Sequence, residues 1–318
     1  MASISRREFF RKTATDAAVA GFMAAGLGAT LRANPLGLPI GSQTYPHRQR
    51  IQCNDFAGLL KDMKGIGIEV IELCSPSYAE FASLADGKMV RKVLDDHGMK
   101  CSSAHFGMNV LRPKQPEMIQ WAKDIGMTQM STASLGGKVT TGMTTLDEVK
   151  RAADEYNKIG AAAKKAGLQQ ALHNEGFENS KLEDGRLTYP VLLEYLDPEL
   201  VKMQFQMSSM RTVGDPIMYF MNHPGRFISA HLQGVDTTQG MQTSRAGMPG
   251  VKPSPEEAAA QGRGGRGGQA AGLAVGEDTV DWPKVFTAAK TAGLKNYFVE
   301  QSWDLTVKSV AYLKTLNV

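Results

Sequence analysis

Short apolar runs rich in β-forming residues alternate with helical patterns along this 318-residue chain, from Leu38 to its end. Strands that alternate with helices predict βα units built around a parallel sheet. Eight strands are expected, at residues 39–45, 68–74, 100–105, 128–133, 168–174, 201–206, 227–232 and 296–300. The number of repeats is what constrains the fold most.

Helical patterns lie between these strands, at residues 54–64, 87–97, 115–125, 145–166, 189–196, 282–292 and 305–316. Five of them end in a glycine before the next strand: Gly67, Gly98, Gly126, Gly167 and Gly293. A glycine at this position accepts the left-handed conformation that terminates a helix. The repeated order of helix, glycine and strand predicts a single-domain α/β fold, a closed (β/α)8 TIM barrel. The sixth helix is the least defined, because only residues 214–222 precede Pro224.

One long segment, residues 237–273, interrupts this pattern after the seventh strand. It is rich in Gly, Arg, Ala, Gln and Pro, so it is expected to be a flexible insertion. Loops that follow barrel strands lie on the face that carries the active site. A flap over that site and an insertion without a role are both open interpretations.

The N-terminus is predicted to be an export signal. Residues 5–12, Ser-Arg-Arg-Glu-Phe-Phe-Arg-Lys, resemble a twin-arginine motif, and an Ala/Gly-rich apolar stretch follows at 17–29. That stretch is too short to span a bilayer stably. We therefore expect a signal at 1–33, a barrel domain at 34–318 and a periplasmic protein that is not membrane-bound once the signal is removed. A retained anchor is the alternative.

The charge of the chain argues against nucleic-acid binding. The net charge is +4, but the first 33 residues hold five basic and two acidic side chains, which leaves about +1 for the rest. A body this close to neutral has little attraction for phosphate backbones. Hydrophobic residues make up 42% and charged residues 21%, which are ordinary values for a globular protein. Cys74 and Cys101 fall in strand-like runs and are expected to be buried small hydrophobic residues.

Polar residues follow or end the expected strands, where a barrel of this type gathers its chemistry. They are Tyr45, His47, Glu72, His105, His173, Glu175, Glu178, Gln204, Gln206, His231, Gln233, Glu300 and Gln301. Carboxylates and imidazoles that converge from separate strands predict a divalent-metal site, Mn²⁺ first, with Mg²⁺, Zn²⁺ or Co²⁺ as alternatives. Each lone histidine could instead be a satisfied core residue. Glu300 ends a buried apolar strand, so its carboxylate needs a partner or a metal.

The whole chain after residue 38 resembles the sugar phosphate isomerase/epimerase, or xylose isomerase-like, superfamily. The resemblance rests on the order and spacing of short segments, at 39–45, 67–73, 103–105, 173–178, 226–231, 281–286 and 299–301. It implies a metal set of Glu178, Gln206, His231 and Glu300, with His173 or Glu175 as alternatives to Glu178. Gln206 stands where the family usually has Asp, and a neutral amide oxygen is a weaker ligand for a hard cation.

The resemblance also implies roles for the remaining residues. Glu178 and Glu300 are expected to be catalytic. Substrate contacts are expected from Tyr45, His47, Glu72, His105, His173, Glu175, Gln233, Gln301 and Trp303. The predicted activity is that of a metal-dependent isomerase or epimerase that moves a proton on a sugar or ketosugar through an enediolate.

Two other functions stay open. One is a β-eliminating lyase or deglycosidase acting on oxidised glycosides, and the other is a sugar-binding barrel without activity. An endonuclease-like barrel is disfavoured, because only six histidines are present and the body lacks basic surface. The expected partner is an uncharged small carbohydrate, since no Gly-rich phosphate cradle is evident. A homo-oligomer stays an open alternative.

Overall fold

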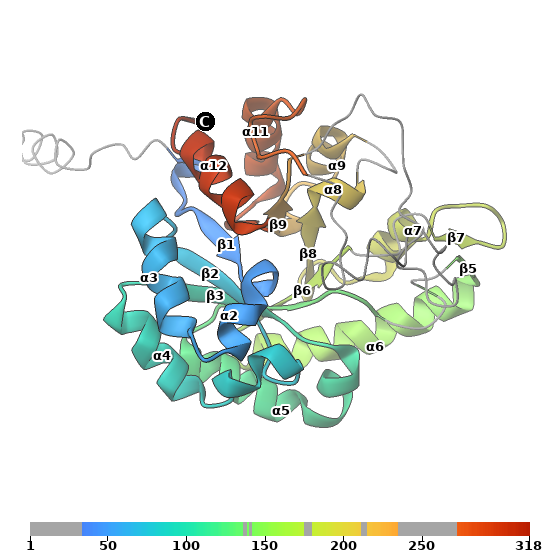
Figure 1. Cartoon of the computed structure of the whole chain (residues 1–318). Coiled ribbons are helices and arrows are strands. Elements are labelled where there is room, and N and C mark those ends of the chain that lie inside the picture. The colour runs from blue at the N-terminus through green and yellow to red at the C-terminus, as the bar shows by residue number, and fades with distance from the viewer. Residues whose placement is uncertain (1–33, 136–138, 140–141, 175–179, 211–214, 235–271) are drawn as a thin grey trace, which may run out of the picture. The chain divides into compact units, whose positions relative to one another are not determined.

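Eight parallel strands close into a barrel, which confirms the predicted (β/α)8 fold (Figure 1). The computed structural model describes residues 34–135, 139, 142–174, 180–210, 215–234 and 272–318. The strand order around the barrel is β1-β10-β9-β8-β6-β4-β3-β2. The strands are β1 (Gly41–Gln43), β2 (Val70–Cys74), β3 (Lys100–His105), β4 (Gln129–Thr132), β6 (Gln169–His173), β8 (Val201–Gln206), β9 (Phe227–Leu232) and β10 (Asn296–Val299). All eight lie at predicted positions.

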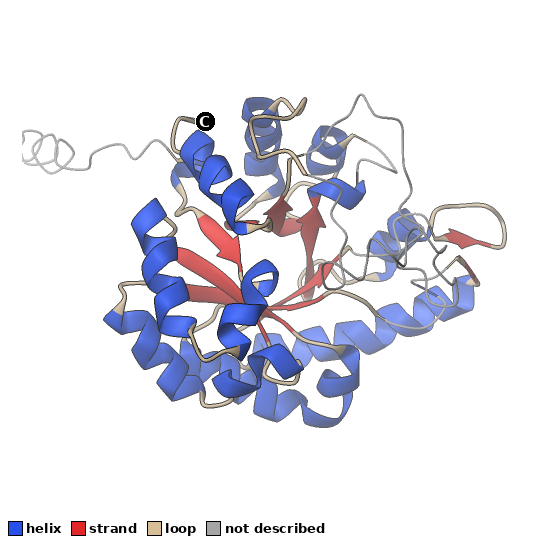
Figure 2. Ribbon diagram, viewed as in Figure 1, coloured by secondary structure: helices blue, strands red, loops and turns tan. Residues whose placement is uncertain are grey.

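Helices surround these strands on the outside of the barrel (Figure 2). The α-helices are α2 (Arg48–Gln52), α3 (Phe56–Ile66), α4 (Gly87–Asp96), α5 (Met108–Ile125), α6 (Leu146–Lys165), α7 (Thr188–Tyr195), α8 (Met207–Met210), α9 (Pro216–Asn222), α11 (Trp282–Ala292) and α12 (Trp303–Leu313). The residues that the structure describes also form three 3-10 helices: η1 (Pro35–Gly37), η2 (Tyr45–His47) and η3 (Ala79–Leu84). The short sixth helix expected before Pro224 is α9.

The predicted helix-ending glycines all have positive φ, from 60° at Gly98 to 99° at Gly67. At Gly67 the backbone N–H bonds back to the carbonyls of Lys64 and Met63, and Ile68 opens the next apolar run. The glycine therefore lets the chain leave the helix and enter the barrel with only three residues between α3 and β2.

Three local features differ from the sequence prediction. The strand expected to reach Tyr45 ends at Gln43, because Tyr45 and Pro46 begin η2. Helix α5 begins at Met108 instead of residue 115 and is kinked at Lys114, between two prolines. A second parallel sheet joins β5 (Met143–Thr144) to β7 (Lys181–Leu182). Strands of two residues carry too little sequence pattern to be predicted.

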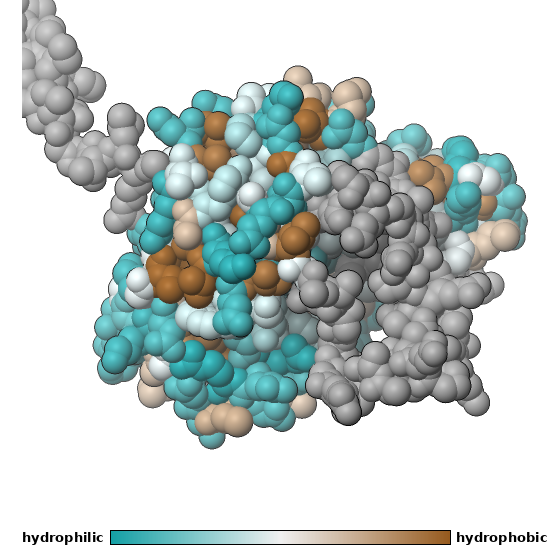
Figure 3. Space-filling model, turned by 45° about the horizontal axis from the view of Figure 1, so that its top comes forward, coloured by the Kyte–Doolittle hydropathy of each residue, from teal (hydrophilic) through white to brown (hydrophobic). Residues whose placement is uncertain are grey.

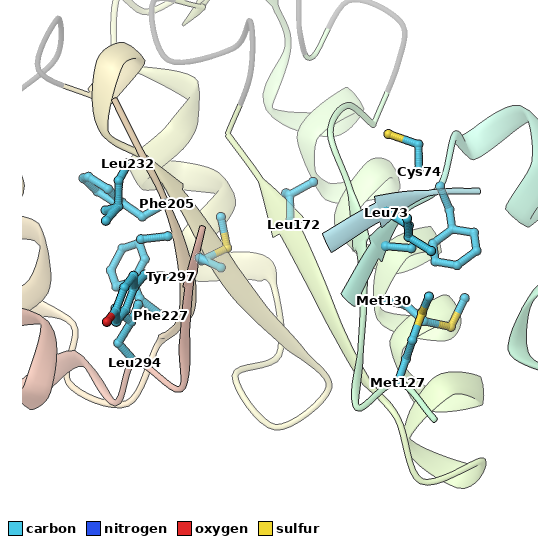
Figure 4. Close-up of a cluster of buried hydrophobic side chains, with 14 of the residues drawn as sticks. Leu73, Cys74, Met127, Met130, Leu172, Phe205, Phe227, Leu232, Leu294 and Tyr297 are labelled. Atoms are coloured by element: carbon cyan, nitrogen blue, oxygen red, sulfur yellow. The ribbon is translucent and has the colours of Figure 1, made fainter. Parts of the chain in front are cut away.

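The layer between strands and helices is apolar. Phe205, Phe227 and Tyr297 gather on the helix side of β8, β9 and β10, and all three are almost fully buried (Figure 4). Burying one such side chain contributes about 1.5–3 kcal/mol. Cys74 and Cys101 are also buried, as predicted. On the face drawn in Figure 3, hydrophilic residues cover most of the described surface, and hydrophobic ones form small separate patches. No helix of the described residues is long and apolar enough to cross a membrane.

The inside of the barrel is polar instead. The Gln129 side chain donates to Ser131 at 2.8 Å and crosses to Ser229 on β9 at 2.8 Å. Ser103 lies 3.3 Å from Ser131, so hydroxyls and an amide fill this level. Most TIM barrels fill their interior with bulky branched side chains. These polar groups lie inside the barrel below a set of charged side chains nearer the carboxyl ends of the strands.

Two predicted segments lie outside the described residues: the export signal at 1–33 and nearly all of the insertion at 237–273. The ends of the insertion are described and meet closely. A Cβ built on Gly234 would lie 2.1 Å from the carbonyl oxygen of Leu273. Only glycine at 234 therefore allows this approach of the two backbones.

Candidate active site

Three ionisable side chains meet inside the barrel near the carboxyl ends of separate strands. Glu72 comes from β2, His105 from β3 and His231 from β9, and all three are buried. The Nε2 atom of His231 lies 2.5 Å from Glu72 Oε1. The Nε2 atom of His105 lies 3.2 Å from the same oxygen. One carboxylate oxygen is therefore shared by two imidazoles.

Gln204 of β8 holds this group in place. Its Nε2 donates to the second oxygen of Glu72 at 2.7 Å. Its Oε1 lies 2.7 Å from His105 Nε2 and accepts a hydrogen bond when that nitrogen is protonated. The amide thus fixes the orientation of both partners from across the barrel.

Glu300, the residue after β10, forms the next level toward solvent. Its Oε2 accepts hydrogen bonds from Gln206 Nε2 at 2.9 Å and Gln233 Nε2 at 3.0 Å. The same oxygen lies 3.2 Å from His231 Nδ1, and the Glu300 side chain is 17% exposed. His231 therefore bridges two carboxylates, one buried and one reaching the barrel mouth.

A third imidazole, His173 of β6, packs against the other two. Its ring centroid lies 4.5 Å from that of His231 and 5.1 Å from that of His105. Burial, then the charges of His231 and His105, hold the pKa of His173 well below the ordinary value. His173 is therefore a neutral imidazole beside its partners.

The two carboxylates and His231 are held in their charged forms. Burial opposes ionisation of Glu72, but the charges of His105 and His231 outweigh it and hold its pKa well below the ordinary value. Burial likewise disfavours a charged His231, yet the carboxylates of Glu300 and Glu72 raise its pKa to about 10. The pKa of Glu300 is lowered, since His231 outweighs the effect of burial. The pKa of His105 is raised despite burial, mainly by Glu72.

Glu72, His105 and His231 can together hold a metal ion. Each offers one ligand atom, and these three atoms all lie within 4.8 Å of one another. One carboxylate and two imidazoles are a common donor set for a catalytic divalent ion that keeps an open position. A divalent cation bound by deprotonated imidazoles also relieves the burial of the cationic His231 ring. The donor set thus fits a metal.

The structure brings together most of the residues predicted from the sequence. His231 and Glu300, expected to share a site, are in contact, and Gln206 joins them through its amide nitrogen. Glu72 and His105, expected to touch substrate, lie at the centre of the charged group. Glu175 and Glu178 lie outside the described residues.

Four predicted residues lie apart from the charged group. Tyr45, His47 and Trp303 lie beyond the ends of β1 and β10, where the His47 and Trp303 rings meet edge to face. Gln301 points elsewhere, because its amide donates to the Leu273 carbonyl at 2.8 Å and accepts from Ser309 at 2.6 Å. Gln301 therefore links α12 to the chain after the insertion.

Sequence reasoning did not find the roles of Gln204 and Asn174. The sequence marks Gln204 only as a polar residue near a strand end. The Asn174 Oδ1 accepts a hydrogen bond from the Gln206 backbone N–H at 2.9 Å. The alternation of strand side chains is the signal for Gln204, because it shares the inward face with Gln206. No comparable signal marks Asn174.

Comparison with known proteins identifies solved structures with a similar fold. Neither a protein-family model nor a curated protein matches the sequence. A sugar phosphate isomerase/epimerase from Parabacteroides distasonis is similar in structure, with a TM-score of 0.64, 20% identity, and coverage of 91% of this chain and 96% of that one. A probable 3-DHS dehydratase, AsbF of Bacillus anthracis, has a TM-score of 0.63 and 12% identity over 88% of this chain and 100% of the other. A xylose isomerase-like TIM barrel protein from Mycobacterium smegmatis, in complex with magnesium, has a TM-score of 0.58 and 14% identity over 88% and 97% of the two chains. The chain therefore has the barrel fold found in sugar phosphate isomerase/epimerase and xylose isomerase-like proteins.

Proposed function

We propose that the protein is a metal-dependent isomerase or epimerase that moves a proton between neighbouring positions of a sugar or ketosugar. The observation that carries this proposal is the buried set of Glu72, His105 and His231, placed in contact with Glu300 at the barrel mouth. Proton transfer next to a carbonyl needs a base that is ionised at neutral pH and stabilisation of the enediolate that forms. The site offers groups for both tasks.

Glu72, His105 and His231 would hold the cation. A divalent ion polarises a carbonyl and an adjacent hydroxyl, which makes the neighbouring C–H more acidic. Two imidazoles and one carboxylate suit Zn²⁺, Co²⁺ or Mn²⁺ better than Mg²⁺, which prefers oxygen ligands. The magnesium in the similar Mycobacterium smegmatis barrel shows that proteins of this fold accept divalent ions.

Glu300 is the residue that we assign to proton transfer. Its lowered pKa keeps it ionised at neutral pH, and its side chain is the most exposed carboxylate of the group. Gln206 and Gln233 fix Oε2 with two N–H donors, and within the described part of the chain no hydrogen bond engages the other oxygen. Glu300 can therefore accept a proton from the substrate at an oxygen that its neighbours leave open.

Solvent exchange tests the proposal. The protein is treated with chelator, resupplied with Mn²⁺, Zn²⁺ or Co²⁺, and incubated with ketosugars and aldoses in deuterated solvent. We expect deuterium at the carbon next to the carbonyl only when metal is present. Glu300→Gln should lower exchange by 10² or more, because general-base catalysis contributes about 10²–10⁴. Its control, Glu277→Gln, replaces a surface carboxylate paired with Lys308 and should keep full exchange. Metal-independent exchange, or full exchange in Glu300→Gln, would contradict the proposal.

A β-eliminating lyase is the second candidate, and the fold likeness to a probable dehydratase favours it. Elimination begins with the same proton abstraction, so the exchange experiment detects both reactions. The products separate them, because elimination leaves an unsaturated sugar and releases the group at the β-carbon.

We also propose that residues 1–33 direct export through the twin-arginine route. The support is the Arg6-Arg7 pair with the apolar stretch that follows it. Arg6→Lys with Arg7→Lys should retain the protein in the cytoplasm, measured by cell fractionation. Unchanged export of the double variant would contradict the signal.

A further inference from the structure

His47 and Trp303 lie side by side at the ends of two neighbouring strands. Strands β1 and β10 pair in the barrel; His47 ends the 3-10 helix that follows β1, and Trp303 opens α12 after β10. The two rings meet edge to face, with centroids 5.7 Å apart and planes at 80°. Because Glu300 also follows β10, three residues before Trp303, this pair lies on the same face of the barrel as the charged group.

His47 has a buried nitrogen that the fold does not use. The residue is 7% exposed, and its Nε2 has no hydrogen-bond partner among the described residues. Burial, helped by the charge of Arg50, lowers the pKa of His47 to about 4, so the ring is neutral at physiological pH. A neutral imidazole offers one donor and one acceptor, and leaving a buried polar atom unpaired costs about 1–3 kcal/mol. A ligand hydroxyl would satisfy it.

The cations next to His47 are already paired. Arg48 donates to the Tyr45 carbonyl at 2.9 Å, covers the Tyr45 ring and lies 3.7 Å from Glu80. Arg50 pairs with Asp55 and with Asp62. Neither guanidinium is therefore left to neutralise a phosphate or carboxylate bound beside His47.

We propose that His47 and Trp303 form a subsite for an uncharged sugar, in which His47 Nε2 bonds a hydroxyl and the Trp303 ring packs against the C–H face of the sugar. This inference rests on the proposed function and names its substrate class. Small-molecule sites combine apolar or aromatic walls with a few placed polar groups, and this pair supplies one of each. The subsite would hold the part of the substrate remote from the reacting carbons.

Binding tests this inference without turnover. D-glucose, D-fructose, D-xylose and glucose 6-phosphate are titrated into the full-length protein by calorimetry. We expect an uncharged sugar to bind, and His47→Asn and His47→Gln each to weaken its Kd about tenfold or more, since each tenfold corresponds to about 1.4 kcal/mol. Circular dichroism verifies that the variants are folded. His97→Asn is the matched control, because His97 bonds the Val93 carbonyl at the end of α4, and its Kd should not change.

Trp303 gives a second readout. The chain has three tryptophans, and Trp121 and Trp282 are 5% and 0% exposed, so Trp303 is the partly exposed one. The uncharged sugar should change the fluorescence of the native protein, and Trp303→Phe should remove that change and weaken binding.

Three outcomes would overturn the inference: no binding by any uncharged sugar, an unchanged Kd in both His47 variants, or tighter binding of glucose 6-phosphate. The proposed function fails separately. If sugar binding depends on His47 but no sugar exchanges deuterium, the subsite stands and the isomerase proposal does not.

Discussion

The two faces of the barrel strands differ in chemistry. On the outward face, Leu73, Phe205 and Tyr297 pack against the helices and are almost fully buried. On the inward face, Glu72, Gln204 and His231 are buried to the same degree but carry charge or amide groups. The outward face follows the general rule that apolar surface leaves water. The inward face costs free energy unless every group is paired.

Glu72 and Leu73 are neighbours on β2 and point to opposite faces, so substituting each in turn tests the difference between the two faces. Glu72→Gln removes the charge that pairs His105 and His231, so we expect a loss of about 3–5 kcal/mol in the free energy of unfolding. Leu73→Ala leaves a cavity on the outward face and should cost a similar 2–5 kcal/mol. Denaturant unfolding measures both losses, and metal binding by calorimetry distinguishes them.

Only Glu72→Gln should lose its metal, because Leu73 offers no ligand. Equal loss of metal binding in a folded Leu73→Ala protein would show that the outer layer also shapes the site. Retained metal binding in Glu72→Gln would remove Glu72 from the ligand set.

The pH dependence of stability tests whether His47, like the inward-facing groups, is a buried polar side chain whose pKa is shifted by the fold. Its pKa is about 4 in the folded chain and about 6.5 when unfolded. Below pH 6.5 the His47 imidazole binds a proton in the unfolded chain but stays neutral in the folded chain. The free energy of unfolding therefore falls as the pH decreases toward 4. At pH 5 the loss is about 2 kcal/mol. His47→Asn should lack this part of the pH dependence between pH 7.5 and 5, measured by urea unfolding. Parallel curves for the two proteins would contradict a buried neutral imidazole.

The sequence predicts the outward face better than the inward one. Gly67 and the apolar run after it are local signals that predict a strand, and β2 lies at that position. Glu72 and His231 are 159 residues apart, and their contact depends on how the closed barrel sets β2 against β9. No local pattern contains that information.

Alternation along a strand would have improved one site prediction. Glu300 and Gln301 are adjacent, and successive side chains of a strand point to opposite faces. The structure follows this rule past the end of β10: Glu300 joins the charged group and Gln301 bonds Ser309 of α12. Their shared position at a strand end predicts both residues in the site, whereas alternation predicts only one of them.

A small polar group in the outer layer allows the finest test of the comparison. Tyr156 of α6 donates to the Ala171 carbonyl at 2.6 Å and accepts from Gln170 Nε2 at 2.7 Å, on the outward face of β6. Tyr156→Phe keeps the ring and removes both bonds, so we expect a loss of about 1–2 kcal/mol. His173 lies on the same strand, β6, and its side chain points inward. A shift of β6 would therefore also move His173 within the charged group. Thermal unfolding measures the stability, and deuterium exchange with added metal measures the site. A normal exchange rate in the less stable variant would mean that the two faces of β6 act independently, whereas a reduced rate would mean that the outer layer positions the inner groups.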